Sequence, residues 1–94
     1  MPYAFVAHVQ FAEGADPELG RKLLQEGLIP AAKAQAGFQS GIWVRSPDAK
    51  SGIGTVVFDT QANAEAGKAA LEAQRPADAP AITDSGVYEV MAQA

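Results

Sequence analysis

A strand that runs directly into a helix is encoded by residues 51–71, SGIGTVVFDTQANAEAGKAAL. Ile53 to Phe58 is apolar and rich in β-branched residues, which is typical of a strand. Asp59 or Thr60 follows, and its side-chain oxygen can accept a hydrogen bond from a free N–H at the start of a helix. The helix is rich in alanine, and a stripe of small residues predicts close packing against a sheet. The stripe consists of Ala62, Ala66, Ala69 and Ala73.

The residues before this unit predict another strand followed by another helix. Tyr3 to Phe11 alternates in the manner of a half-buried strand. Asp16-Pro17-Glu18 predicts a helix start, with an N-cap oxygen, a proline at the first helical position and an acid in the first turn. Pro30 predicts a kink or a break, because proline has no N–H to donate to the carbonyl of Glu26. Gly37 is the predicted C-terminal cap.

The rest of the chain completes a recognisable order of elements. Phe38 to Ser46 alternates as a second strand, and a polar hairpin loop at residues 46–52 leads into the strand that begins at Ile53. Pro76 to Thr83 has no periodicity and is interpreted as a connector, and Gly86 to Met91 as the last strand. The order β-α-β-β-α-β predicts a ferredoxin-like α+β fold. We expect a four-stranded antiparallel sheet with two helices on one face, in a single domain that spans residues 1–94.

Composition excludes several classes of function. The chain has 94 residues, a net charge of −4 and only seven Lys and Arg residues, so it lacks the basic patch that binds nucleic acid or anionic membranes. It has no cysteine, and therefore no disulfide, no thiolate nucleophile and no Cys-based metal site. Its start has neither a basic leader nor a cleavage site, and no stretch approaches the ~20 apolar residues of a membrane span. We therefore expect a cytoplasmic protein.

The second face of the sheet is expected to remain uncovered, because two helices can cover only one face. Alternation places a largely apolar set there: Val6, His8, Trp43, Ile53 or Val56, and Tyr88 or Val87. Exposed apolar patches of this size mark interfaces or ligand grooves. Pairing two such sheets face to face would bury the patch, so the sequence predicts a homodimer.

Three segments carry a resemblance to a known family: Ile29-Pro30-Ala31 with Gly37-Phe38, Val57-Phe58-Asp59-Thr60 with Ala64-Glu65-Ala66, and the terminal Val87-Tyr88-Glu89-Val90. In this order and spacing the chain resembles the dimeric α+β barrel superfamily, and within it the antibiotic-biosynthesis-monooxygenase-like domains. The resemblance implies a homodimer with a barrel cavity. It also implies oxidation of a small aromatic or polyketide-type substrate without a cofactor. The alternative is a non-catalytic small-molecule-binding or stress-related dimeric module.

The same resemblance weighs against haem degradation. Family members that degrade haem use an Asn, a Trp and a His, with the His late in the second helix. This chain has Asn63 early in that helix and no histidine along it, and Phe58 stands where the family often has Trp.

Four residues are the candidate site. His8 is the only histidine and the candidate catalytic base, with a purely structural role as the alternative. Trp43 and Arg45 lie two residues apart on one strand face and are candidate substrate-binding residues, an aromatic wall and an anion partner. The alternative is that Trp43 belongs to a dimer core and Arg45 to a solvated strand end. Tyr88 either reaches the substrate with its hydroxyl or serves packing.

Two further expectations concern the geometry of this site. Parity along the strands predicts that His8 and Trp43 point away from the helices and line one cavity, with Arg45 near its rim. Asn63 orients a substrate oxygen or, alternatively, serves the local backbone. No metal site is expected, because a lone histidine without an HxH or HxxxH partner cannot form one.

Overall fold

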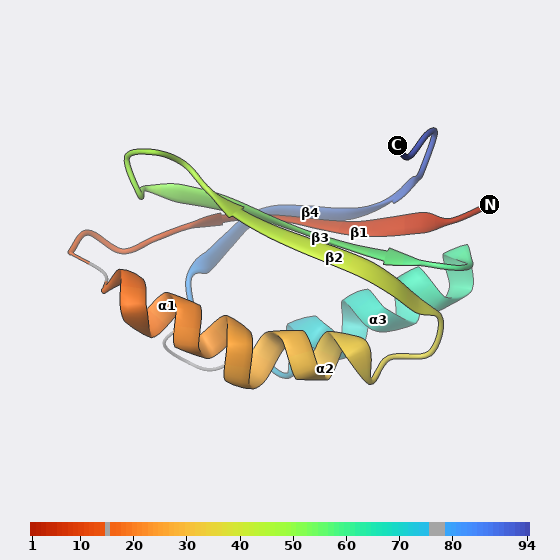
Figure 1. The fold of residues 1–94 in the computed structure, drawn as a ribbon, viewed down its shortest axis with the longest axis horizontal. Coiled ribbons are helices and arrows are strands. Elements are labelled where there is room, and N and C mark those ends of the chain that lie inside the picture. Colours follow the sequence, from red (N-terminus) through yellow and green to blue (C-terminus); the bar gives the residue numbers. More distant parts are fainter. Residues whose placement is uncertain (15, 76–78) are drawn as a thin grey trace.

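The computed structural model describes residues 1–14, 16–75 and 79–94, and its elements follow the predicted order (Figure 1). Four strands form one antiparallel sheet in the order β2-β3-β1-β4, and the helices lie together on one side of it. The predicted ferredoxin-like α+β fold is confirmed. The elements are β1 (Tyr3–Gln10), α1 (Pro17–Leu23), the π-helical η1 (Leu24–Leu28), α2 (Ile29–Lys33), β2 (Phe38–Arg45), β3 (Ser51–Phe58), α3 (Gln61–Ala73) and β4 (Ala81–Glu89).

The core lies between the helices and the helix-covered face of the sheet. Phe5 of β1 and Val56 and Phe58 of β3 contribute the sheet side, and Phe58 is fully buried. The helices contribute a small set of buried side chains, Ala32, Ala64 and Leu71. Because the sheet residues are large and the helix residues are mostly small, the helices can approach the sheet closely.

Helix α3 begins as predicted but buries a different face. The hydroxyl of Thr60 accepts a hydrogen bond from the N–H of Asn63, so Thr60 is the N-cap. The side chain of Asn63 donates to the carboxylate of Asp59 at 2.7 Å, so its contact is local but is made with a side chain instead of the predicted backbone. The buried residues of α3 are Ala64, Gly67 and Leu71, whereas the predicted stripe is exposed: Ala62, Ala66, Ala69 and Ala73. That prediction was wrong, because Gly67 lets the helix settle on the ring of Phe58.

The first helical segment, which runs without a break through α1, η1 and α2, is distorted next to Pro30, as predicted. Asp16 caps α1 by accepting a hydrogen bond from the N–H of Glu18. The segment then widens into the π-helical η1, where the N–H of Ile29 bonds to the carbonyl of Leu24, five residues earlier. Distortions within helices are found at prolines and at π-helical turns, and here the two lie next to each other. The lack of an N–H on Pro30 is thus absorbed by a widened turn, and α2 continues beyond it.

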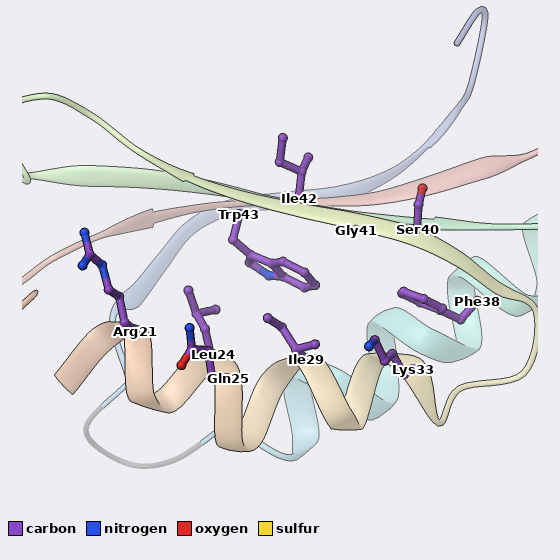
Figure 2. Close-up of a pocket in the computed structure, with 10 residues that line it drawn as sticks. All are labelled: Arg21, Leu24, Gln25, Ile29, Lys33, Phe38, Ser40, Gly41, Ile42 and Trp43. Atoms are coloured by element: carbon purple, nitrogen blue, oxygen red, sulfur yellow. The ribbon is translucent and has the colours of Figure 1, made fainter. Parts of the chain in front are cut away.

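A β-bulge near the start of β2 decides which way its side chains point. Phe38 pairs with Phe58, but Ser40 pairs with Val57, so Gln39 is an extra residue in the ladder. A bulge shifts the parity of every residue after it by one. As a result Trp43 faces the helices and Ile42 faces away from them (Figure 2). The prediction that Trp43 points away from the helices was therefore wrong.

The uncovered face of the sheet carries a row of apolar side chains. Cross-strand partners share a face in an antiparallel sheet, so the registers place Val44, Ile53, His8 and Asp84 side by side there. Ile42 is 61% exposed, Tyr88 52%, Val44 50% and Ile53 38%. We call Ile42, Val44, Ile53 and Tyr88 the open-face patch. The predicted apolar open face is therefore present, although Val6, His8, Ile53 and Tyr88 of the predicted set lie on it and Trp43, Val56 and Val87 do not.

Two boundaries differ from the sequence-based expectations. Strand β4 starts at Ala81 because Ala81 and Ile82 pair with Gln10 and Val9, after a bulge between His8 and Val9. The end of the predicted connector is therefore strand, and residues 76–78 lie outside the described residues. The first helical segment ends at Lys33, and Gly37 at a φ of 79° forms the turn before β2 rather than the cap itself.

The hairpin loop between β2 and β3 is closed by side-chain hydrogen bonds. The hydroxyl of Ser46 and the N–H of Lys50 both donate to Asp48, and they lower the pKa of its carboxyl below the ordinary value.

The described helices are all too short or too polar to traverse a lipid bilayer.

Gly67 tests the close approach between α3 and β3. A Cβ at Gly67 would lie 2.8 Å from Cε1 of Phe58, whereas a Cβ at Gly20 in α1 would meet nothing within 4 Å. Alanine is favoured over glycine in helices by about 1 kcal/mol, but overpacking costs roughly 1–3 kcal/mol. Gly67→Ala should therefore lower the free energy of unfolding, and Gly20→Ala should raise it by up to about 1 kcal/mol. Urea denaturation measures both; stabilisation by Gly67→Ala would contradict the packing described here.

Candidate functional site

Two cavities lie between the first helical segment and the sheet. The larger has a volume of about 790 Å³ and is enclosed by α1, η1, the helix-covered face of β1, β2 and β3, and the end of α3. The smaller, of about 570 Å³, lies between η1, α2 and the outer strand β2 (Figure 2). Arg21, Leu24 and Trp43 line both cavities. Trp43 therefore stands as a shared aromatic wall between two adjoining spaces.

The indole of Trp43 lies against the backbone of the sheet at two glycines. A Cβ at Gly41 would lie 2.6 Å from Cη2 of Trp43, and a Cβ at Gly54 would lie 2.8 Å from its Cδ1 and 3.0 Å from its Nε1. No other residue type could occupy either position without moving the ring. Glycine inside a strand often marks such a close approach. The two glycines thus fix the indole in a position where one ring face is supported by the sheet and the other is turned towards the helices (Figure 2).

The remaining lining of the larger cavity is mainly apolar. Phe5, Ala7 and Val56 supply its floor from the sheet, and Leu23 and Leu28 supply its roof from the first helical segment. The smaller cavity adds the ring of Phe38, which points towards the helices near Lys33 (Figure 2). A flat, largely apolar molecule fits such a lining, because these side chains offer few hydrogen-bond partners.

The four predicted site residues fall into two pairs on opposite faces of the sheet. Trp43 and Arg45 share the helix-covered face and both line the larger cavity, so their predicted adjacency is confirmed. His8 and Tyr88 lie on the open face, and neither lines a described cavity. The expectation that His8 and Trp43 line one cavity was wrong, because the bulge at Gln39 turns Trp43 inward. A catalytic role for His8 stays a prediction that would need a different cavity, on the open face.

A small polar cluster borders the larger cavity. Glu72 of α3 lines this cavity, and its Oε1 accepts a hydrogen bond from Ser85 at 3.3 Å and lies 2.8 Å from Nζ of Lys68. Lys68 and Glu72 are both about one-third exposed. Glu72 is thus a carboxylate held in a fixed position beside the apolar space. Among the described residues, no group of three or more His, Cys, Asp or Glu side chains is arranged to hold a metal ion.

Sequence reasoning overlooked two features of this site. The glycines at 41 and 54 flank Trp43 in the ladder, and an indole between two strand glycines is a readable sign of ring-on-backbone packing. The second feature is Arg21, which lies mostly in solvent, with 64% of its side chain exposed, but also borders both cavities. No pattern in the sequence alone indicates that second property.

Comparisons with known proteins agree on the fold. No protein-family model matches the chain, and no curated protein matches it. Solved structures do. SnoaB, a cofactor-independent oxygenase from Streptomyces nogalater, superposes with a TM-score of 0.67 at 14% identity, over 98% of this chain and 95% of that one. The heme-degrading protein Rv3592 from Mycobacterium tuberculosis gives 0.66 at 19% identity, over 100% and 99%.

A third neighbour carries the family name. An antibiotic-biosynthesis-monooxygenase-like protein from Chloroflexus aurantiacus gives a TM-score of 0.64 at 17% identity, over 100% of this chain and 98% of that one. The resemblance stated from the sequence is therefore confirmed for the fold. The chain has the same ferredoxin-like α+β fold as these proteins and covers 95–99% of each of them.

The glycine support of Trp43 can be tested directly. Gly54→Ala should displace the indole, because the new Cβ would lie 2.8 Å from Cδ1. Since Trp43 is the only tryptophan in the chain, its surroundings are reported by the long-wavelength tryptophan band of the near-ultraviolet circular dichroism, beyond the absorption of tyrosine and phenylalanine, and by the fluorescence maximum excited in the same band. Both signals should change in Gly54→Ala and remain as in the parent protein in Gly20→Ala. Identical spectra for all three proteins would show that the indole does not rest on Gly54.

Proposed function

We propose that this protein is a monooxygenase-like protein that takes a small, flat aromatic or polyketide-type molecule into the cavities beside Trp43 and oxidises it without a cofactor. The observation that carries the proposal is the indole fixed on Gly41 and Gly54, with an apolar space of about 790 Å³ beside it. Stacking against such a ring stabilises an aromatic ligand by about 0.5–1.5 kcal/mol beyond the burial of its surface.

The fold neighbours support the proposed chemistry. One of them is a cofactor-independent oxygenase. Where no cofactor takes part, the substrate, once deprotonated, itself has to supply the electrons to dioxygen. Oxidation of a ring CH₂ to a carbonyl balances with one O₂ and releases one water. The protein then has to hold the ring and exclude bulk water. It also has to accept the proton that the substrate loses, or stabilise the negative charge that remains on the substrate. An apolar cavity with a fixed carboxylate, Glu72, at its wall suits these tasks better than the open face that carries His8.

The second candidate function is a non-catalytic binding module that uses the same cavity. It is favoured by the position of His8, the one histidine of the chain, on the face away from both cavities. The two candidates share the ligand and differ only in turnover, so one experiment separates them.

The test measures binding and oxygen uptake with the same probe. A hydroxylated anthrone should quench the fluorescence of Trp43 in the parent protein. Trp43→Leu should weaken calorimetric binding about fivefold or more, since stacking contributes about 1 kcal/mol. Tyr88→Phe, a change on the open face, should bind as the parent does. Oxygen uptake above the rate of spontaneous oxidation supports the enzyme, whereas binding without uptake supports the binding module. Absence of binding would contradict both.

We further propose that the protein is a homodimer that pairs through the open-face patch. The support is the exposure of Ile42, Val44, Ile53 and Tyr88 together on one flat sheet face, which is unusual for a monomer. A second copy offers the same apolar face, so burial is mutual in a two-fold arrangement.

Assembly can be tested with two single substitutions. Light scattering of the parent should give twice 9.7 kDa, or 19.4 kDa, at micromolar concentration. Ile42→Lys should shift the mass to that of one chain, because it buries a charge within the proposed interface. Leu19→Lys replaces an apolar residue of α1 that is 48% exposed, and it should leave the mass unchanged. A parent protein that runs as a monomer would overturn the proposed pairing.

A further inference from the structure

The basic side chains of this acidic protein gather around the two cavities. The chain has only seven Lys and Arg residues and a net charge of −4. Five of the seven line a cavity: Arg21, Lys22, Arg45 and Arg75 the larger one, and Arg21 and Lys33 the smaller. We call these five residues the cationic rim. Of the two others, Lys50 lies in the β2–β3 hairpin loop and Lys68 pairs with Glu72.

The acidic side chains show the opposite distribution. The chain has eleven Asp and Glu residues. Among those that the structure describes, only Glu26 and Glu72 line either cavity. Glu72 has its own counter-ion at 2.8 Å in Lys68, so its charge is largely balanced locally. The surroundings of the cavities are therefore positive although the protein as a whole is negative.

From this distribution we infer that the ligand is an anion: a flat aromatic ring that carries a carboxylate, phenolate or enolate, seated against Trp43 with its charge towards the cationic rim. The inference rests on the proposed function, and it names the class of ligand that the same cavities select. A cleft lined by one sign of charge beside low-dielectric walls concentrates ions of the opposite sign. The aromatic wall and the positive charge together favour binding of an aromatic ring with an anionic substituent over binding of the same ring without a charge.

Arg21 is the residue most suited to recognise the charge. It is the one basic residue that lines both cavities, so its guanidinium can meet a ligand in either space. Its described ion pair is with Glu18 at 3.6 Å, and the two side chains are 64% and 81% exposed. Pairs this exposed contribute little. The guanidinium is therefore available to turn towards a carboxylate, which it can hold with two parallel hydrogen bonds.

A pair of probes isolates the charge from the ring. 2-Naphthoate and 2-naphthamide have the same ring, and only the first is an anion at neutral pH. At low salt the parent protein should bind the naphthoate about two- to fivefold more tightly, the range expected for a partly exposed charge contact. Raising the salt concentration to 0.5 M should remove most of this preference, because exposed charges are then screened. The amide should bind equally at both salt concentrations.

Two substitutions with the same change in net charge provide the control. Arg21→Gln should remove most of the preference for naphthoate and leave the affinity for naphthamide unchanged. Lys50→Gln, which lowers the net charge equally but lies outside the cationic rim, should keep the full preference. Equal affinity of the parent for both probes would overturn the inference while the proposed function stands. Equal effects of the two substitutions would also overturn it. If neither probe binds, the proposed function fails and the inference fails with it.

Discussion

The extra residue at Gln39 is the constraint on which the two functional surfaces depend. Without the bulge, β2 would present Trp43 to the open face and Ile42 and Val44 to the helices. With it, Phe38 and Trp43 both face the helices, and the aliphatic side chains of β2 form part of the open-face patch. A single inserted residue in an edge strand thus decides which side of the sheet is aromatic and which is aliphatic.

The larger cavity arises because the first helical segment does not pack on the sheet along its whole length. Its C-terminal part packs into the core through Ala32, whereas α1 contributes no buried residue. The π-helical turn at Leu24–Leu28 lies between these two parts. On the other side of the cavity, Gly41 and Gly54 let Trp43 lie down on the sheet instead of standing up into the space. The cavity therefore has two causes: α1 does not pack against the sheet, and the indole of Trp43 lies flat on the sheet.

The sequence was sufficient for the fold because each element has its own local signal. Asp16-Pro17-Glu18 marks a helix start, Pro30 marks a distortion, and the strand at Ile53–Phe58 leads into a capped helix; all three are present. Which face each helix or strand buries was harder to predict from the sequence. The alanine-rich helix could bury several small-residue stripes, and the one chosen depends on the ring of Phe58 meeting Gly67. Such a contact joins two elements and leaves no trace in the periodicity of either.

The candidate site shows the same division between local and non-local information. That Trp43 and Arg45 share a face follows from their spacing, and the structure agrees. Trp43 and His8 lie on opposite faces because of the bulge at Gln39. A glutamine at this position gives no sign in the sequence that a bulge will form there.

The two surfaces are joined through the backbone of β2. Ile42 and Val44 point to the open face, and Trp43 between them points to the cavities. Strand β2 lies at the edge of the sheet, and Trp43 rests there on Gly41 of its own strand and on Gly54 of β3. A partner that packs on Ile42 and Val44 would restrain the same few residues that carry the indole. We therefore expect a partner that covers the open face to restrain Trp43 as well, through the backbone of β2.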